Sequence, residues 1–387
     1  MKKIFEKITP IVSIGLFLFA GCAKDEPSMD RANLLRTGVY ETSGVHEFSE
    51  VMWKSKVETA MRSGGPAIAN GIVYYGGNKG ILYALDIKTG QEKWKFKADL
   101  DISLSPVTIA KGVVYFGVGD ALYAVDTKTG QKKWKFEAQG GWSFSSPAIV
   151  DEVVYFSGLD GNFYAVDTKT GQEKRRFNTG GQITRSSPAI ADEIAYFGNR
   201  IRKRNDFYDG NFYAVNIKTG QEKWKLETDG EVWSTPAIVD NVVYFTSSAH
   251  TAKLYAVDTK TGEVKWKFST QALVGLSSPV IADNVIYFCS DDEADDNIKA
   301  NLYAVDSSTG QEKWRFKIVE GWECSDPCIA EGVIYFGGID GYLYAIDSKT
   351  GQEKWKFKTQ SGISTPPVIA DGVVYIVSDD GFLYAIK

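Results

Sequence analysis

Short apolar runs alternate with turn-forming residues along most of the chain, with a period of about 40 residues. In one copy, the runs 146–150, 153–156 and 163–167 follow one another, and the turn 168–171 leads into a fourth run. Runs of four or five residues between Gly- and Asp-containing turns are typical of β-strands in tight hairpins. No helical periodicity accompanies them. The pattern therefore predicts an all-β protein built from four-stranded units.

Eight copies of this unit follow one another from Ser63 onward. Each copy has a tyrosine at the same place in its third strand: Tyr83, Tyr123, Tyr164, Tyr213, Tyr255, Tyr303, Tyr344 and Tyr384. A proline precedes each first strand: Pro66, Pro106, Pro147, Pro188, Pro236, Pro279, Pro327 and Pro366. Four short strands in about 40 residues are characteristic of a propeller blade. We therefore predict an eight-bladed β-propeller.

The eighth copy lacks its fourth strand, because the chain ends at Lys387. The missing strand is found near the start of the chain, where residues 51–57 match the W-K-F-K strand of the other copies. An N-terminal strand that completes the last blade closes the ring and removes two exposed strand edges. The propeller domain is therefore expected to span residues 51–387.

Residues 1–21 have the features of a lipoprotein signal peptide. A basic start at residues 2–7 precedes the mostly apolar stretch 8–20, which is too short to span a membrane. This stretch leads to Cys22 through Phe-Ala-Gly, which resembles a bacterial lipobox and implies lipidation of that cysteine. A plain signal peptide is the alternative. Residues 22–50 are polar and are expected to form the lipidated cysteine and a flexible tether.

The turn into each fourth strand carries the pattern A-x-D-x-x-T-G-x-x-x-W. Five copies match it in full. In two further copies one residue differs: Asn216 stands in place of the Asp, and Arg175 in place of the Trp. The pattern resembles the tryptophan-docking motif of the quinoprotein (PQQ-type) propeller repeat family. An indole packed against the next blade contributes roughly 2–3 kcal/mol by the area it buries. A structural role is therefore expected for Trp53, Trp94, Trp134, Trp224, Trp266, Trp314 and Trp355.

Taken as a whole, the chain resembles the BamB family of lipoproteins from the β-barrel assembly machinery of the outer membrane. The resemblance rests on the lipobox, the tether, the Trp53 strand, the eight blades and the ending D-G-x-x-Y-x-I at residues 380–386. It implies a monomeric, non-catalytic scaffold without cofactor or metal. Such a scaffold would sit at the periplasmic face of the outer membrane and bind a protein partner that assembles β-barrel proteins.

Two other functions remain open. One is a dehydrogenase dependent on PQQ and Ca²⁺, for which Trp233, Arg185 and Asp326 are candidate contacts. The chain lacks an adjacent cysteine pair and has only two histidines, which argues against this and other catalytic sites. The other is a lipoprotein that binds a small ligand or a glycan in the propeller funnel. A net charge of −5 gives no reason to expect nucleic acid.

The two faces of the predicted propeller differ in their loops. The turns between third and fourth strands are nearly uniform, whereas the connections into each first strand vary and are better suited to build a site. The BamB resemblance implies partner contact through the loops into blades 4 and 5, at Ile183, Arg185 and Glu231. Trp233 departs from the acidic residue of that family. Trp142 and Trp322, in opposite blades, are further candidate anchors, or side chains that fill the central channel.

Two insertions and three cysteines complete the candidate chemistry. The insertion at residues 200–204 is basic, and the one at residues 291–297 is acidic without the ligand spacing of an EF-hand, so a solvated loop is the simpler interpretation. An extended strand separates Cys324 and Cys328 by roughly 13 Å, too far for a disulfide. Cys289 with one of these two is the better pair, and the sequence does not decide which.

Overall fold

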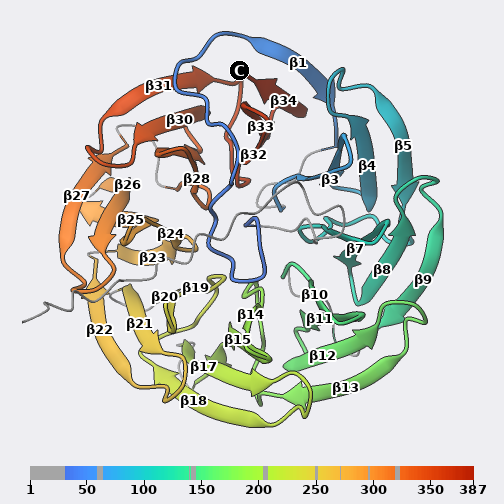
Figure 1. The fold of residues 1–387 in the computed structure, drawn as a ribbon, viewed down its shortest axis with the longest axis vertical. Helices are drawn as coiled ribbons and strands as arrows, with labels where there is room; N and C mark the ends of the chain where they lie inside the picture. The colour runs from blue at the N-terminus through green and yellow to red at the C-terminus, as the bar shows by residue number, and fades with distance from the viewer. Residues whose placement is uncertain are drawn as a thin grey trace, which may run out of the picture.

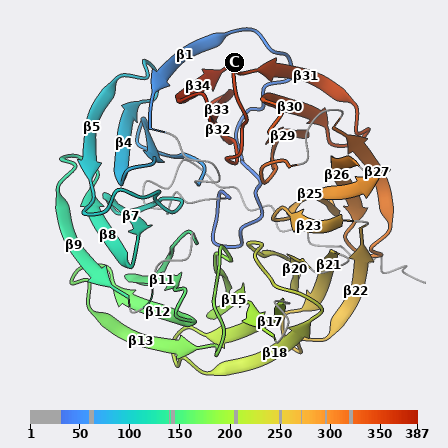
Figure 2. The same cartoon turned by 180° about the vertical axis from the view of Figure 1, so that it is seen from behind.

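The protein is an eight-bladed ring of β-sheets. The computed structural model describes residues 31–58, 64–138, 140, 145–203, 208–248, 252–270, 272–294, 297–318 and 323–387, without the side chains of 272–276 and 292–299. Eight antiparallel sheets stand around a common axis, as Figures 1 and 2 show from opposite sides. The predicted eight-bladed propeller is confirmed. No helix in the described residues is long and apolar enough to cross a membrane.

Each blade is an antiparallel meander that runs from the axis outward. Blade 1 contains β2 (Ala67–Ala69), β3 (Ile72–Gly76), β4 (Ile81–Asp86) and β5 (Glu92–Lys97). Blade 2 contains β6 (Thr108–Ala110), β7 (Val113–Val118), β8 (Ala121–Asp126) and β9 (Lys132–Glu137). Blade 3 contains β10 (Ala148–Val150), β11 (Val153–Ser157), β12 (Asn162–Asp167) and β13 (Glu173–Asn178). Blade 4 contains β14 (Ala189–Ala191), β15 (Ile194–Gly198), β17 (Tyr208–Asn216) and β18 (Glu222–Thr228), with β16 (Ile201–Arg202) added to β17.

The second half of the ring repeats this order. Blade 5 contains β19 (Ala237–Val239), β20 (Val242–Ser247), β21 (Lys253–Asp258) and β22 (Val264–Ser269). Blade 6 contains β24 (Val280–Ala282), β25 (Val285–Ala294), β26 (Asn297–Asp306) and β27 (Glu312–Lys317), with β23 (Ala272–Leu276) added to β25. Blade 7 contains β28 (Cys328–Ala330), β29 (Val333–Gly337), β30 (Tyr342–Asp347) and β31 (Glu353–Lys358). Blade 8 contains β32 (Val368–Ala370), β33 (Val373–Ser378), β34 (Phe382–Ile386) and β1 (Val51–Lys56).

Blade 8 joins the two ends of the chain. Strand β1 pairs antiparallel with β34, so that Trp53 lies opposite Ala385 and Lys56 opposite Phe382. The Lys387 carbonyl accepts hydrogen bonds from the backbone N–H groups of Ser49 (2.7 Å) and Glu50 (2.9 Å). The predicted closure by an N-terminal strand is therefore confirmed, and the last blade has no open edge.

The hydrophobic core is divided among the seams between neighbouring blades. The middle strands of a blade have both faces covered by neighbours, so β11 is buried along its whole length and reads as a continuous apolar run. The outer strand β13 alternates between exposed and half-buried residues, because only one of its faces is covered. One apolar cluster fills each of the eight seams and takes side chains from both of the blades that meet there.

The tryptophan motif joins each blade to the next. The Trp94 indole donates from Nε1 to the Thr127 carbonyl at 2.9 Å and lies flat over Gly130, where an added methyl group would approach the ring to 2.9 Å. Gly130 also has φ 68°, so glycine is required at this turn for two reasons. In blade 3, Arg175 replaces the indole and donates from Nη1 to the Ile217 carbonyl at 2.7 Å. The guanidinium therefore keeps the hydrogen bond but not the ring contact.

The segment before β1 differs from the expected flexible tether. Residues 31–45, here called the axial segment, run from the rim at β1 to the centre of the ring, as the blue trace in both views shows (Figures 1 and 2). Arg36 in this segment is fully buried and Arg31 is 3% exposed. This packing was not predicted, because the segment is short and matches no strand of the repeat. The tether assignment is thus incorrect for residues 31–50, and the described chain is packed from Arg31 onward.

Candidate functional site: the axial channel and the loop face

The axial segment is hydrogen-bonded to the inner strands of four successive blades. The carbonyl oxygens of Leu34, Leu35, Thr37 and Gly38 accept from the middle N–H of β14, β19, β24 and β28, at 2.9, 3.0, 3.2 and 3.1 Å. Inner strands of a propeller have no partner on the axis side, so these N–H groups would otherwise need water. The segment therefore acts as a shared edge partner for half of the ring.

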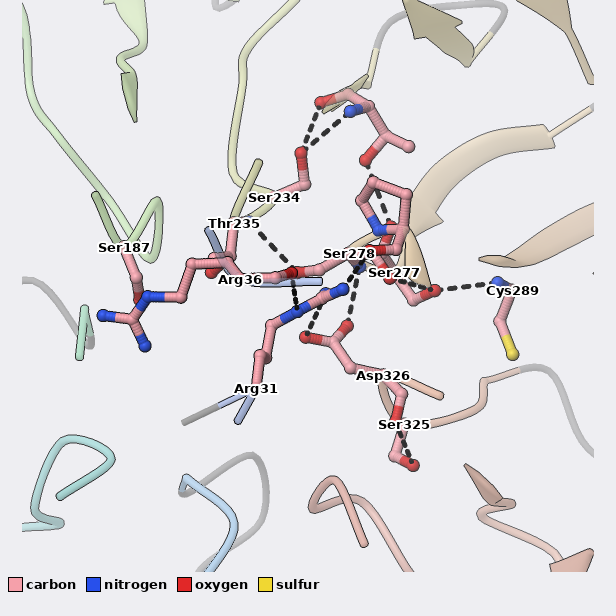
Figure 3. A network of polar contacts seen from close by, with 12 residues as sticks. Arg31, Arg36, Ser187, Ser234, Thr235, Ser277, Ser278, Cys289, Ser325 and Asp326 are labelled. Carbon is pink, nitrogen blue, oxygen red and sulfur yellow. Dashed lines mark hydrogen bonds and ion pairs between the residues drawn. The ribbon is translucent and has the colours of Figure 1, made fainter. Parts of the chain in front are cut away.

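Two arginines fix the tip of the axial segment (Figure 3). Arg36 donates to the carbonyls of Ser146 (3.2 Å), Pro147 (3.1 Å) and Pro188 (3.3 Å) in blades 3 and 4. Arg31 reaches across the channel to the Pro279 carbonyl and lies 3.8 Å from the Asp326 carboxylate. A guanidinium carries five donors, so it can satisfy several backbone carbonyls at once. Together the two side chains connect blades 3, 4, 6 and 7 across the axis.

A belt of short polar side chains surrounds these arginines. In three blades, the side chain of the residue before the inner-strand proline accepts a backbone N–H from the same position one blade earlier. Ser187 accepts from Ser146 at 2.8 Å. Ser278 accepts from Thr235 at 3.0 Å, and Asp326 accepts from Ser278 at 2.7 Å (Figure 3). Asp326 thus occupies a place held by serine or threonine in every other blade except blade 1, which has Gly65, and its charge is matched by Arg31. The repeated S-S-P and S-T-P tripeptides are the sequence signal for this belt, which was not among the predicted features.

The axial segment also replaces a turn that blade 8 lacks. In other seams, a tyrosine and a tryptophan donate to one carbonyl in the next blade's outer turn, as Tyr196 (3.2 Å) and Trp224 (3.0 Å) do to Thr259. At the seam of blades 7 and 8, the acceptor is instead the Val45 carbonyl, which lies 2.9 Å from the Tyr335 hydroxyl and 2.8 Å from Trp355 Nε1. Residues before β1 therefore complete the last blade beyond the strand that the sequence predicted.

The loops into blades 4 and 5 meet on the face opposite the uniform turns, here called the loop face. The Arg185 guanidinium lies 6.0 Å from the centre of the Trp233 ring, within range of a cation–π contact. Burial raises the pKa of Glu231, and attraction to Arg200 and to the Trp233 N–H opposes part of the rise. Within the described residues, Glu231 Oε2 and Trp233 Nε1 are buried without a well-aligned hydrogen bond. The carboxylate and the indole N–H therefore interact with each other in poor alignment, beside a cation.

The other predicted contact residues divide into two groups. Ile183 is fully buried in the seam of blades 3 and 4, so the expectation that it contacts a partner is wrong. Its loop is one residue longer than the loop into blade 5, where Val232 takes the equivalent seam position. Trp142 and Trp322 lie outside the described residues, as does the proposed lipidation site, Cys22.

The two insertions extend hairpins on the same face. Arg200 donates twice to the Gln182 side chain, at 2.9 and 2.7 Å, and its guanidinium lies 5.1 Å from the Tyr208 ring centre. The acidic insertion lengthens β25 and β26 to ten residues each. Asp295, Asp296 and the side chains of 292–299 lie outside the description, so the expected absence of a metal site stays a prediction there.

The residues present do not fit a quinone cofactor at the axis. Asp326, the candidate catalytic carboxylate, is committed to Arg31 and to the Ser278 N–H. The Trp233 ring has the Arg185 guanidinium over it, so neither residue is presented as a free stacking or carboxylate-binding group. The axis between the inner strands holds the axial segment itself. These three candidate contacts do not converge on one site.

Comparisons with known proteins agree with this geometry. The family profile described as outer membrane protein assembly factor BamB matches residues 44–182, 174–320 and 298–387. The fold is similar to BamB from Moraxella catarrhalis, with TM-score 0.68 and 17% identity over 87% of this chain and 99% of that one. It is also similar to a quinohemoprotein alcohol dehydrogenase from Comamonas testosteroni, with TM-score 0.80 and 15% identity over 94% of this chain and 80% of that one. At such identities these likenesses show the fold alone.

One characterised relative shares only a short stretch. The serine/threonine-protein kinase AfsK of Streptomyces griseus is 40% identical over 57 residues, which is 15% of this chain and 7% of the kinase. A match of this length covers little more than one blade. The family profile, in contrast, extends from the axial segment to the last residue. The chain therefore belongs to the family of the outer membrane protein assembly factor BamB.

Proposed function

We propose that the protein is a non-catalytic scaffold that binds a protein of the β-barrel assembly machinery through the loop face of blades 4 and 5. A lipid at Cys22 would hold it at the periplasmic face of the outer membrane. Family membership supports the role in assembly. The scaffold assignment is further supported by the axial channel, in which Arg31 lies 3.8 Å from the carboxylate of Asp326, one of the candidate cofactor contacts.

One observation carries the choice of surface. Arg185, Trp233 and Glu231 come from two different loops and form one half-buried cluster, in which a carboxylate oxygen and an indole N–H lack aligned partners among the described residues. Buried polar groups are normally hydrogen-bonded, so such groups at a surface point to a partner that completes them. Arginine and tryptophan are also the side chains most enriched at the energetic centres of protein interfaces.

A pull-down from native membranes tests this proposal. The tagged protein is solubilised in mild detergent, and the bound proteins are identified and quantified by mass spectrometry. Arg185→Glu and Trp233→Ala should each lower recovery of the partner at least about tenfold, which corresponds to about 1.4 kcal/mol of binding free energy.

Lys128→Glu is the matched control, because it makes the same charge change at an exposed turn on the opposite face. It should leave recovery unchanged, and thermal unfolding should show that all variants fold. Equal recovery with Arg185→Glu, Trp233→Ala and the unmodified protein would contradict the proposed surface. Purification without any assembly protein would contradict the proposed partner, and glycan or small-ligand binding would then be tested.

A further inference from the structure

We propose that Cys289 and Cys324 form a disulfide that ties blade 6 to blade 7 at the loop face. Cys289 lies in β25, the second strand of blade 6, and is 1% exposed. Cys324 lies in the connection into blade 7 and packs against the apolar cluster that contains Cys289. Both are thiols in the structure. This proposal concerns covalent chemistry within the chain and is independent of the partner proposed above.

The position of Cys289 is repeated in other blades. Its backbone N–H donates to the Ser277 hydroxyl at 2.7 Å, two residues before the inner-strand proline (Figure 3). Gly198 donates in the same way to Ser186 at 2.9 Å, and Gly337 to Ser325 at 2.9 Å. Gly198 in blade 4 and Gly337 in blade 7 are therefore the structural equivalents of Cys289.

The position of Cys324 is repeated as well. The Glu323 carbonyl, which directly precedes Cys324, accepts the N–H of Ile339 at 3.2 Å. Ile339 lies two residues after Gly337, the blade 7 equivalent of Cys289. The carbonyls of Glu231 and Gly362 accept equivalent N–H groups, from Ser248 at 2.9 Å and Asp379 at 2.8 Å. The residues that follow these two carbonyls are Val232 in blade 5 and Ile363 in blade 8. They are the structural equivalents of Cys324.

These two positions face each other at the seam of blades 4 and 5 and at the seam of blades 7 and 8. A methyl group added at Gly337 would lie 2.6 Å from Cβ of Ile363, and one added at Gly198 would overlap the Val232 side chain. Both seams accommodate a β-branched side chain by placing glycine opposite it. The seam of blades 6 and 7 instead places two cysteines opposite each other. A disulfide joins Cβ atoms about 3.5–4.5 Å apart, which is within reach of side chains that meet so closely.

The remaining thiol belongs to a different seam. Cys328 lies in β28 and packs in the cluster between blades 7 and 8, whereas Cys289 packs in the cluster between blades 6 and 7. Burial raises the pKa of the Cys328 thiol, so it stays protonated and a poor nucleophile for thiol–disulfide exchange. The fold thus decides between the two pairings that the sequence left open.

The chemistry requires an oxidant. Two thiols lose two protons and two electrons to form one S–S bond, and a disulfide donor such as oxidised glutathione accepts them and becomes two thiols. Burial raises the pKa of the Cys324 thiol, and the adjacent Cys289 thiol raises it further. Because the thiolate is the reacting species, the bond should form while the blades assemble and only slowly in the folded ring.

The test refolds the full, unmodified chain with a mixture of reduced and oxidised glutathione and maps its disulfides. Proteolysis between Cys324 and Cys328, at Asp326, followed by mass spectrometry should give a peptide pair linked through Cys289 and Cys324. Two fewer titratable thiols should remain than after reduction. The oxidised form should melt roughly 5 °C higher than the reduced form, because the bond closes a loop of about 35 residues.

A matched variant separates this pairing from the alternatives. Cys328→Ala should keep the linked peptide pair and the difference in melting temperature, whereas Cys324→Ala should abolish both. A link that includes Cys328, or no link after refolding under oxidising conditions, would overturn the proposal. Mapping of the unmodified chain decides between these results even where a variant fails to fold.

Discussion

At the scale of single residues, the most informative position is the one that breaks the tryptophan motif. The Arg175 guanidinium donates to the Ile217 carbonyl, as an indole N–H does to the equivalent carbonyl in other blades. Its aliphatic side chain does not cover Gly220 as an indole ring covers the equivalent glycine. A shallow surface hollow, lined by Tyr155, Phe177 and Ile217 among others, lies beside it. The motif therefore has two separable parts, a hydrogen bond and a ring contact, and blade 3 has only the first.

Arg175→Trp should stabilise the protein by about 1 kcal/mol, because the indole would bury apolar area in this hollow and keep the same acceptor. Urea unfolding at pH 7 measures the change. The reciprocal variant, Trp134→Arg in the preceding blade, should lower the free energy of unfolding by a similar amount. If Arg175→Trp lowers the free energy of unfolding and Trp134→Arg leaves it unchanged, the ring contact contributes nothing to stability.

At the scale of elements, the axial segment is the part of the structure with the largest consequence for function. It satisfies inner-strand N–H groups in four blades and supplies the Val45 carbonyl that blade 8 lacks. The buried guanidinium of Arg36 donates hydrogen bonds to three backbone carbonyls and one serine hydroxyl, which belong to blades 3 and 4. Tight packing of this kind couples the N-terminal segment to the stability of the whole ring.

Arg36→Ala should lower the free energy of unfolding by about 2–3 kcal/mol, because it leaves several buried acceptors unpaired. Leu35→Ala is the control on the same segment, since Leu35 is 37% exposed, and should change stability by less than about 1 kcal/mol. Cys328 lies near Arg31 and is 3% exposed, so its thiol should react with a maleimide faster in Arg36→Ala than in the unmodified protein. Equal stability and equal labelling in both variants would mean that the segment is not held by Arg36.

At the scale of the whole molecule, the repeated turns set the response to acid. The Asp126 carboxylate accepts the N–H groups of Lys128 and Thr129, both at 3.0 Å, and lies 3.1 Å from the Lys133 ammonium group. The nearby lysine and these N–H groups lower the pKa of Asp126 to about 2, and similar contacts lower the pKa of Asp86 to about 2. A carboxyl group with a lowered pKa in the folded state stabilises the fold above its unfolded pKa. That stabilisation is lost as the pH falls from about 4 to about 2.

Blade 4 contains a natural comparison, because Asn216 accepts the same N–H groups through an uncharged oxygen, at 2.9 Å from Lys218 and 2.8 Å from Thr219. Asp126→Asn should therefore be less stable than the unmodified protein at pH 7 and lose less stability between pH 4 and pH 2. Asn216→Asp should show the opposite trend. Thermal melts across this range measure both, and parallel pH profiles for all three proteins would contradict the assignment.

The sequence predicted those parts of the molecule that local patterns specify. Strands, turns and the closure at Trp53 follow from alternation and from the A-x-D-x-x-T-G-x-x-x-W motif, so the blade number was obtained correctly. The axial segment was not predicted, because many of its contacts are made by backbone carbonyls, such as those of Leu34 and Gly38. Every residue type has such a carbonyl, so the sequence carries no signal for these contacts. Ile183 was misplaced because loop length, and not spacing from the proline, sets which residue enters the seam.

The central claim is that the loop face of blades 4 and 5 binds an assembly protein, and site-specific photocrosslinking tests it most directly. A photoreactive phenylalanine analogue replaces Trp233 in one strain and Lys128, on the opposite face, in another, and native membranes are irradiated. We expect the Trp233 position to crosslink to a subunit of the β-barrel assembly machinery and the Lys128 position to give no such product. Crosslinks from Lys128 alone, or from neither position, would contradict the account.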